Sequence, residues 1–203
     1  MKAILLLLVL VVSSSVVQAE EALVSGPIRF SGTGCPAIST DTVVTDDLKT
    51  VSLLFSDFDA NTGTSIHKSY ESKSCELIVP VTVPAGWRIK ISKFDFRGFR
   101  FLGNSTDLSW MVTQFKIKSR NVTTYSGSNS LFSRGPQNTD FFQEPTGSVS
   151  SYACGGAMEI RIKAQLIATS HTCRAGSQTT LQLDSIDFTT VASAGDFQYS
   201  KCR

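Results

Sequence analysis

The chain has 203 residues, of which 41% are hydrophobic and 18% are charged, and its formal net charge is only +2. A chain of this length suits one domain with a sizeable core. A net charge so close to zero gives no general indication of binding to nucleic acid or to another polyanion.

The first nineteen residues have the pattern of a secretory signal peptide. Lys2 precedes an apolar run over residues 3–12, which is too short to span a bilayer, and small residues stand at the positions expected before a cleavage site. We therefore expect cleavage after Ala19 and a secreted, extracellular domain over residues 20–203. No second apolar run approaches about 20 residues, so we expect no membrane span.

The first half of the mature chain shows strand patterns. Residues 50–55 and 77–83 are short apolar, β-branched runs. Residues 88–101 alternate, but the apolar positions change parity twice. Because a regular strand keeps its parity, the two changes predict bulges near Lys93 and at Gly98.

The second half continues in the same way. Residues 109–118 and 158–168 alternate strictly, and residues 179–188 alternate with a parity change near Asp184. No segment of the mature chain has a convincing helical period. We therefore predict an all-β fold, a single antiparallel β-sandwich of about eight strands, jelly-roll-like and stapled by disulfides.

Residues 123–151 read as a long loop, because they are rich in Ser, Gly, Asn and Thr. The segment nevertheless carries Tyr125, Phe141 and Phe142. Two interpretations follow. The aromatic side chains pack back onto the sandwich, or they are exposed and contact a ligand.

Five cysteines are expected to form disulfides, with one left over. Cys35 and Cys75 flank the first strands and form a reasonable pair. Cys154 and Cys173 flank the strand at residues 158–168, which separates them by on the order of 35 Å. If that strand forms a hairpin with residues 179–188, Cys154 and Cys202 lie at the same end. We therefore predict bridges Cys35–Cys75 and Cys154–Cys202, with Cys173 free or linked to another chain.

One segment resembles a calcium loop. Asp57, Asp59 and Asn61 alternate as oxygen ligands do in such loops. However, Gly63 comes one place late for an EF-hand, and Lys68 stands where the closing glutamate belongs. The alternative, which we favour, is a polar turn that leaves the strand at residues 50–55 and needs no cofactor.

Two glycosylation sequons bracket the strand at residues 109–118. They begin at Asn104 and Asn121, both in expected turns, where a glycan would fit. The alternative is two chance matches.

Basic residues are concentrated between residues 88 and 120. They are Arg88, Lys90, Lys93, Arg97, Arg100, Lys116, Lys118 and Arg120. One interpretation is contact with an acidic polysaccharide or another polyanion. We favour the other, which is that they are solvated side chains on several strand faces, because the charges occupy both parities of the strand.

No catalytic motif is recognisable. The sequence has no GxSxG, HExxH or Walker loop. Cys173 has His171 two residues away, but no orienting acid is evident. The remaining candidates are four carboxylates, whose separations one sequence does not give: Asp57, Asp59, Asp184 and Asp187. We therefore favour a protein that is not an enzyme.

Several short motifs in a fixed order resemble a known family. They are Gly34-Cys35-Pro36, Leu53-Leu54-Phe55-Ser56-Asp57-Phe58, Lys73-Ser74-Cys75-Glu76-Leu77, Pro84-Ala85-Gly86-Trp87, Phe96-Arg97-Gly98-Phe99, Cys154-Gly155, Asp184-Ser185-Ile186-Asp187 and Lys201-Cys202. Together they resemble the uncharacterised secreted-protein family named domain of unknown function DUF4360, over nearly all of the mature chain. Cys173 is not part of the family pattern, which agrees with leaving it unpaired. The resemblance implies no activity and no functional residue.

Three functions remain. The first is a secreted, non-enzymatic structural or binding protein of an extracellular matrix, wall or surface assembly, with an extracellular protein or polysaccharide as partner, or with self-assembly through edge strands. The second is a lectin-like protein that stacks sugars on exposed aromatic side chains, with Trp87 and Trp110 as further candidates. The third is a hydrolase with an unfamiliar site.

Overall fold

The structure, a computed structural model, describes residues 23–46, 50–91, 94–119, 122–144, 149–150, 153–171, 175–189 and 197–201. The expected signal peptide lies outside these ranges. Within them the chain forms fifteen strands and one short 3-10 turn, η1 (Ala37–Ser39). The predicted all-β sandwich is confirmed, although the strands outnumber the eight expected.

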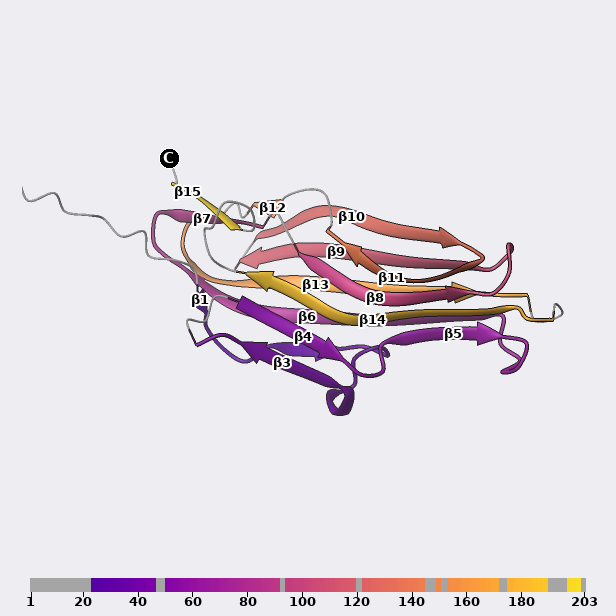
Figure 1. Ribbon diagram of the computed structural model, residues 1–203. Helices are drawn as coiled ribbons and strands as arrows, with labels where there is room; N and C mark the ends of the chain where they lie inside the picture. Colours follow the sequence, from indigo (N-terminus) through magenta and orange to yellow (C-terminus); the bar gives the residue numbers. More distant parts are fainter. Residues whose placement is uncertain are drawn as a thin grey trace, which may run out of the picture.

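Six antiparallel strands make the first sheet, sheet A (Figure 1). Its order is β1-β6-β13-β9-β10, and β2 also pairs with β6. The strands are β1 (Leu23–Val24), β2 (Arg29–Ser31), β6 (Tyr70–Val83), β9 (Leu108–Ser119), β10 (Val122–Arg134) and β13 (Gly156–Thr169). The three central strands β6, β13 and β9 are long, which gives this sheet a broad regular surface.

Sheet B lies against sheet A and has the order β11-β8-β14-β4-β3, with β5 also pairing with β14. Its strands are β3 (Thr40–Val44), β4 (Thr50–Phe55), β5 (Asp59–Gly63), β8 (Asp95–Leu102), β11 (Gln137–Gln143) and β14 (Gln178–Thr189). A third, small sheet has the order β12-β7-β15 and gathers at one end of the sandwich, on the left in Figure 1. It consists of β7 (Trp87–Ile91), β12 (Val149–Ser150) and β15 (Phe197–Lys201).

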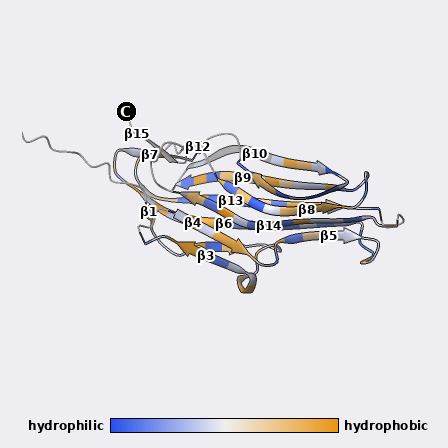
Figure 2. Cartoon of the chain, viewed as in Figure 1, coloured by the Kyte–Doolittle hydropathy of each residue, from blue (hydrophilic) through white to orange (hydrophobic). Residues whose placement is uncertain are grey.

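The core lies between sheets A and B. Hydrophobic and polar residues alternate along the strands, as Figure 2 shows, so that one face of each sheet turns inward. On β13 the residues from Met158 to Ala168 with even numbers are buried, and those with odd numbers are not. Aromatic rings join the two layers. The Phe115 ring of sheet A stacks on Phe94 at 4.3 Å between centroids and meets Phe96 of sheet B at 6.1 Å.

The segment predicted as a long loop is mostly strand. Residues 123–151 contain β11, β12 and most of β10. The prediction was wrong because polar residues on an edge strand and on outward faces resemble loop composition. The chain passes from β10 in sheet A to β11 in sheet B, so this segment closes one side of the sandwich.

The expected hairpin of residues 158–168 with residues 179–188 was also wrong. The first segment lies in β13, between β6 and β9 of sheet A, whereas the second lies in β14, at the centre of sheet B. Both patterns alternate cleanly because each strand faces the same core from opposite sides. Alternation shows which face is buried, but not which strand is the neighbour.

One of the predicted irregularities is present where β14 passes β8. The pairing shifts between Leu183 and Ser185, which agrees with the parity change expected near Asp184. On β8 itself no parity change occurs at Gly98, because Phe96, Gly98 and Leu102 are all buried. A glycine is needed at position 98 because a Cβ atom would lie 2.1 Å from the carbonyl oxygen of Gln182.

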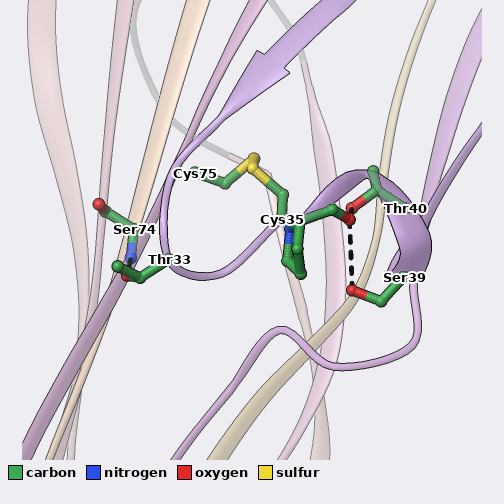
Figure 3. Close-up of a disulfide and its surroundings, with 7 residues drawn as sticks. Thr33, Cys35, Ser39, Thr40, Ser74 and Cys75 are labelled. Carbon is green, nitrogen blue, oxygen red and sulfur yellow. Dashed lines mark hydrogen bonds between the residues drawn. A yellow bond between two sulfur atoms is a disulfide. The ribbon is translucent and has the colours of Figure 1, made fainter.

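Cys35 and Cys75 form the predicted disulfide, with their Cα atoms 5.4 Å apart (Figure 3). The bridge joins the connection between β2 and η1 to the core side of β6. The amide of Gly34 donates to the carbonyl oxygen of Ser74 at 2.9 Å, and the hydroxyl of Thr33 accepts from the Ser74 amide at 3.2 Å. The connection from sheet A to sheet B is therefore fastened at several points.

Cys154 is also disulfide-bonded, and its partner lies outside the described residues. The described backbone favours Cys202 over Cys173. The Gly155 amide donates to the Trp87 carbonyl at 2.8 Å, and Lys201 pairs with Trp87 across β7 and β15. The chain next to Cys154 and the chain next to Cys202 therefore meet at the same residue. Cys154 precedes β13, whose fourteen residues span about 45 Å. His171, two residues before Cys173 in the sequence, stands beyond the other end of this strand.

Removal of Cys202 and Arg203 should lower the free energy of unfolding of the mature protein by about 2–5 kcal/mol, because the truncated chain cannot close this bridge. Chemical denaturation measures the loss, and removal of Arg203 alone is the matched control. Peptide mapping without reduction should give a Cys154–Cys202 peptide. A Cys154–Cys173 peptide, or equal stability of the two truncated chains, would show that the pairing is wrong.

Candidate functional site

The outer surface of sheet A is the strongest candidate for a functional site. We call it the sheet A face and define it by the outward residues of β9 and β13: Trp110, Val112, Gln114, Lys116 and Lys118, and Glu159, Arg161, Lys163, Gln165 and Ile167. These side chains point outward because the residues between them are buried in the core. Register places each residue of the first set opposite one of the second, beginning with Trp110 opposite Ile167.

An aromatic pair stands at one end of this face. Trp110 on β9 is opposite Phe132 on β10. Their ring centroids are 5.3 Å apart and the rings are inclined by 50°. Phe132 is 52% exposed although its neighbour Leu131 packs against the core. Two large aromatic rings on the solvent side of a sheet do not contribute to the core, which indicates a contact surface.

Polar side chains follow the aromatic pair along the face. The Gln165 amide donates to the Ser72 hydroxyl at 2.9 Å, and Gln114 is exposed. Such side chains offer both donors and acceptors to a ligand lying across the strands.

The other end of the face is charged and hollowed. Glu159 accepts from Arg29 at 2.9 Å and from Arg161 at 2.7 Å, and Arg161 also lies 3.7 Å from Glu76. The hydrogen bond from Arg161 lowers the pKa of Glu159, and burial opposes this effect without cancelling it. A cavity of about 330 Å³ opens beside these groups, and Pro80, Lys118 and Glu159 are among the residues that line it.

The predicted calcium ligands are not arranged as a metal site. Asp57 is exposed in the turn after β4, and the Asp59 carboxylate faces the Lys73 ammonium at 3.6 Å and accepts from the Asn61 side-chain amide. In the part of the chain that the structure describes, no three His, Cys, Asp or Glu residues are grouped so as to hold a metal ion.

Glu71, which the sequence did not single out, belongs to the same region. Its carboxylate accepts from the Asn61 backbone amide and from the Lys68 ammonium, each at 2.6 Å. Burial raises the pKa of Glu71, but these two hydrogen bonds together with the positive charges of Lys68 and Lys73 outweigh it, and the pKa is lowered. Lys68, which stands at the position of a closing calcium ligand, thus makes an ion pair within the fold.

The predicted aromatic contacts are divided between core and surface. Phe141 is only 7% exposed, and its ring covers Gly98, which excludes it as an exposed contact. Phe142 is 55% exposed on the outer surface of sheet B, where the Arg97 guanidinium lies 5.6 Å from its ring centroid. Tyr125 stands opposite Lys116 in the register of β10 and β9, but its side chain lies outside the described set. Trp87 is partly buried against the core.

The basic residues noted in the sequence do not share one face. Lys116 and Lys118 lie on the sheet A face, whereas Arg97 lies on the outer surface of sheet B. Arg100 is partly buried and donates to the Ser133 hydroxyl at 2.7 Å. The interpretation that these charges are distributed over several faces agrees with this arrangement. Pattern alone could not show that Arg29, Arg161 and Lys163, from other strands, adjoin Lys116 and Lys118.

The two histidines, although far apart in sequence, lie at the same end of the sandwich. The His171 amide donates to the Ser177 hydroxyl at 2.9 Å, and His67 and Ser177 line a pocket of about 480 Å³. The Ser177 hydroxyl donates to the buried Asp107 carboxylate at 2.6 Å. In a Ser-His-Asp triad a histidine stands between hydroxyl and acid, whereas here the hydroxyl bonds the acid directly, so the contact does not have triad geometry. Cys173 lies outside the described residues.

The four carboxylates considered for hydrolysis are engaged separately. Asp184 accepts from the Gln182 amide at 2.8 Å, and Asp187 accepts from the Ser185 hydroxyl at 3.1 Å. Asp59 lies beside Lys73, and Asp57 is exposed in a turn, so each of the four carboxylates has its own surroundings.

Of the two sequons, the structure describes only the first asparagine. Asn104 is half-buried in the turn before β9, and its side-chain amide donates to the Ala175 carbonyl at 3.5 Å. Asn121 lies outside the described residues. Glycosylation at Asn104 and Asn121 stays a prediction.

Comparison with known proteins identifies relatives without a known activity. The family model described as Domain of unknown function (DUF4360) matches residues 23–202. An uncharacterized secreted protein of Arthroderma benhamiae is 27% identical over 152 residues, which cover 72% of this chain and 60% of that protein. The chain thus spans less than two thirds of the length of this relative.

Among solved structures, TmCBM61 in complex with beta-1,4-galactotriose is similar at 13% identity and a TM-score of 0.31, covering 87% of this chain and 89% of that one. A similarity this low indicates nothing about what the present chain binds.

The predicted location agrees with these findings. The relative from Arthroderma benhamiae is a secreted protein, and no described helix is long and apolar enough to cross a membrane. The family match covers almost all of the chain outside the predicted signal peptide. The protein is therefore secreted and belongs to the family named domain of unknown function DUF4360, as its sequence motifs predict.

Proposed function

We propose that this protein is a secreted, non-enzymatic binding protein that holds a polysaccharide on the sheet A face. The observation that carries the proposal is the Trp110–Phe132 pair on the outside of a regular sheet, in which Trp110 is half-buried and Phe132 is 52% exposed. The apolar C–H faces of sugar rings stack on aromatic rings, so such a pair suits a saccharide better than a charged peptide.

The polar part of the face fits the same ligand. Sugar hydroxyls need both donors and acceptors, which Gln114 and Gln165 supply next to the aromatic pair. From Trp110 to Lys116 the strand rises by about 20 Å, so an extended polymer would contact the whole face rather than its end alone. A single sugar would leave most of these groups unused.

The carboxylates on the face favour binding over catalysis. A general acid in glycoside hydrolysis needs a raised pKa. The hydrogen bond from Arg161 instead lowers the pKa of Glu159. Glu159 is therefore suited to ordering the arginine groups and not to donating a proton. Glu76 lies beside the same arginine, at 3.7 Å from Arg161.

Trp110→Ala together with Phe132→Ala should weaken polysaccharide binding by roughly 10–100-fold, because both stacking surfaces are lost. A glycan array selects the ligand, and titration of the selected soluble polysaccharide measures the affinity of the mature protein. Phe142→Ala is the matched control, since it removes an exposed ring from the opposite surface. Equal affinity of the double variant and the parent, or loss with Phe142→Ala alone, would contradict the proposed site.

A structural role through self-assembly is the second candidate. The thirteen-residue strand β10 stands at the edge of sheet A, where a strand from another copy can pair with it. Sedimentation velocity over a range of concentrations tests this role. A protein that remains monomeric throughout would contradict it and leave the polysaccharide proposal intact.

A further inference from the structure

The two outer surfaces of the sandwich carry opposite charge. Five basic side chains lie on or beside the sheet A face, against two acidic ones, Glu76 and Glu159. The basic residues are Arg29, Lys116, Lys118, Arg161 and Lys163. The near-neutral net charge of the chain therefore conceals a separation of charge between its faces.

The outer surface of sheet B shows the reverse balance. Its strands present five aspartates, of which Asp187 lies 3.9 Å from Arg97 and Asp59 lies 3.6 Å from Lys73. The aspartates are Asp59 on β5, Asp95 on β8, Asp140 on β11, and Asp184 and Asp187 on β14. A polyanion would be repelled by this surface and attracted by the sheet A face, so the charge pattern selects one side of the molecule.

We propose that the polysaccharide bound on the sheet A face is anionic and bears carboxylate or sulfate groups. This inference rests on the proposed function and specifies its ligand. The aromatic pair would stack sugar rings at one end of the face, and the lysine ammonium groups would meet the acidic groups of the polymer toward the other end.

The surplus positive charge comes from the lysines. Both carboxylates on the face are already bound by arginine: Glu159 by Arg29 and Arg161, and Glu76 by Arg161. Lys116 stands opposite Arg161, and Lys163 stands between Glu76 on β6 and Gln114 on β9. Lys118 and Lys163 are exposed. Lys118 lines the cavity, Lys116 follows it on β9, and Lys163 stands one residue pair further along on β13, so the three lysines follow one another along the face.

The chemistry of the lysine head group fits this role. An ammonium group is a compact charge on a flexible stem, so a row of lysines accommodates acidic groups that recur along a polymer without one fixed geometry. The guanidinium groups of Arg29 and Arg161 are held by the two carboxylates. The aromatic pair distinguishes the face from a purely electrostatic patch, because stacking requires a ring of the ligand.

The test compares polymers that share a backbone and differ in charge. Polygalacturonate and its fully methyl-esterified form are titrated with the mature protein at low and high ionic strength, and a sulfated galactan separates sulfate from carboxylate recognition. We expect the acidic polymer to bind at least 10-fold more tightly than the ester, with the difference shrinking as salt screens the charges.

Charge variants complete the test. Lys116→Gln, Lys118→Gln and Lys163→Gln together should abolish most of the preference for the acidic polymer and flatten its salt dependence. Arg97→Gln, a neutralisation on the opposite surface, should change neither. Trp110→Ala with Phe132→Ala should reduce affinity while preserving the salt dependence.

The outcomes separate the two proposals. Equal binding of the acidic and esterified polymers, unaffected by the lysine substitutions, would overturn the anionic ligand and leave the polysaccharide site standing. Failure of every polysaccharide to bind would overturn both. Double-stranded DNA that binds as tightly as the acidic polymer, independently of Trp110 and Phe132, would show a bare polyanion patch and also overturn this inference.

Discussion

Phe96→Ala should lower the free energy of unfolding by roughly 3–5 kcal/mol, the largest effect we expect from one substitution. Phe96 is fully buried on β8, and its ring meets Phe115 of the opposite sheet at 6.1 Å between centroids. Truncation removes a ring that joins the two layers and leaves a cavity that the paired strands cannot close. Urea denaturation of the mature protein, followed by tryptophan fluorescence, measures the change.

Phe142→Ala is the matched control for this prediction. Phe142 stands opposite Arg97, the residue next to Phe96, but its side chain is 55% exposed on the outside of sheet B. Its truncation should change stability by no more than about 0.5 kcal/mol. If both variants lost the same stability, the assignment of the core to the space between the sheets would be wrong.

Cys35→Ala together with Cys75→Ala should lower the free energy of unfolding by about 2–5 kcal/mol. The bridge closes a separation of 40 residues, for which loop entropy alone corresponds to roughly 4 kcal/mol. It also holds Gly34 close to the Phe58 ring, where a Cβ atom would stand 2.1 Å from the ring carbons. Loss of the bridge therefore has two effects. It increases the conformational entropy of the unfolded chain, and it loosens the connection between the sheets in the folded protein.

Ser74→Ala provides the comparison for the disulfide. Ser74 precedes Cys75 on β6, and its side chain faces the other side of the sheet. Its substitution therefore measures the effect of an alanine at this point of β6 while the Cys35–Cys75 bridge stays intact. We expect a change within about 0.5 kcal/mol. Unfolding under non-reducing conditions keeps the disulfide of Cys154 intact in both variants. A double alanine variant as stable as the parent would mean that the bridge adds nothing beyond the packing around it.

Much of the fold could be predicted from patterns in the sequence. Strict alternation at residues 158–168 identified the inward and outward faces of β13, because a strand places successive side chains on opposite sides. The parity change near Asp184 identified the irregularity of β14 in the same way. The cysteine positions identified the Cys35–Cys75 bridge, and the motif order identified the family.

Only the tertiary structure decided which strands are neighbours, and with them the candidate site. Trp110 meets Phe132, and Lys116 meets Arg161, because β9 lies between β10 and β13. Pairing between strands depends on contacts distant in sequence, and alternation looks the same in either sheet. The sequence by itself therefore determined an extracellular, disulfide-bonded β-sandwich. The folded chain decided that the Trp110–Phe132 pair shares one outer face with Lys116 and Arg161, because that arrangement depends on the order of the strands.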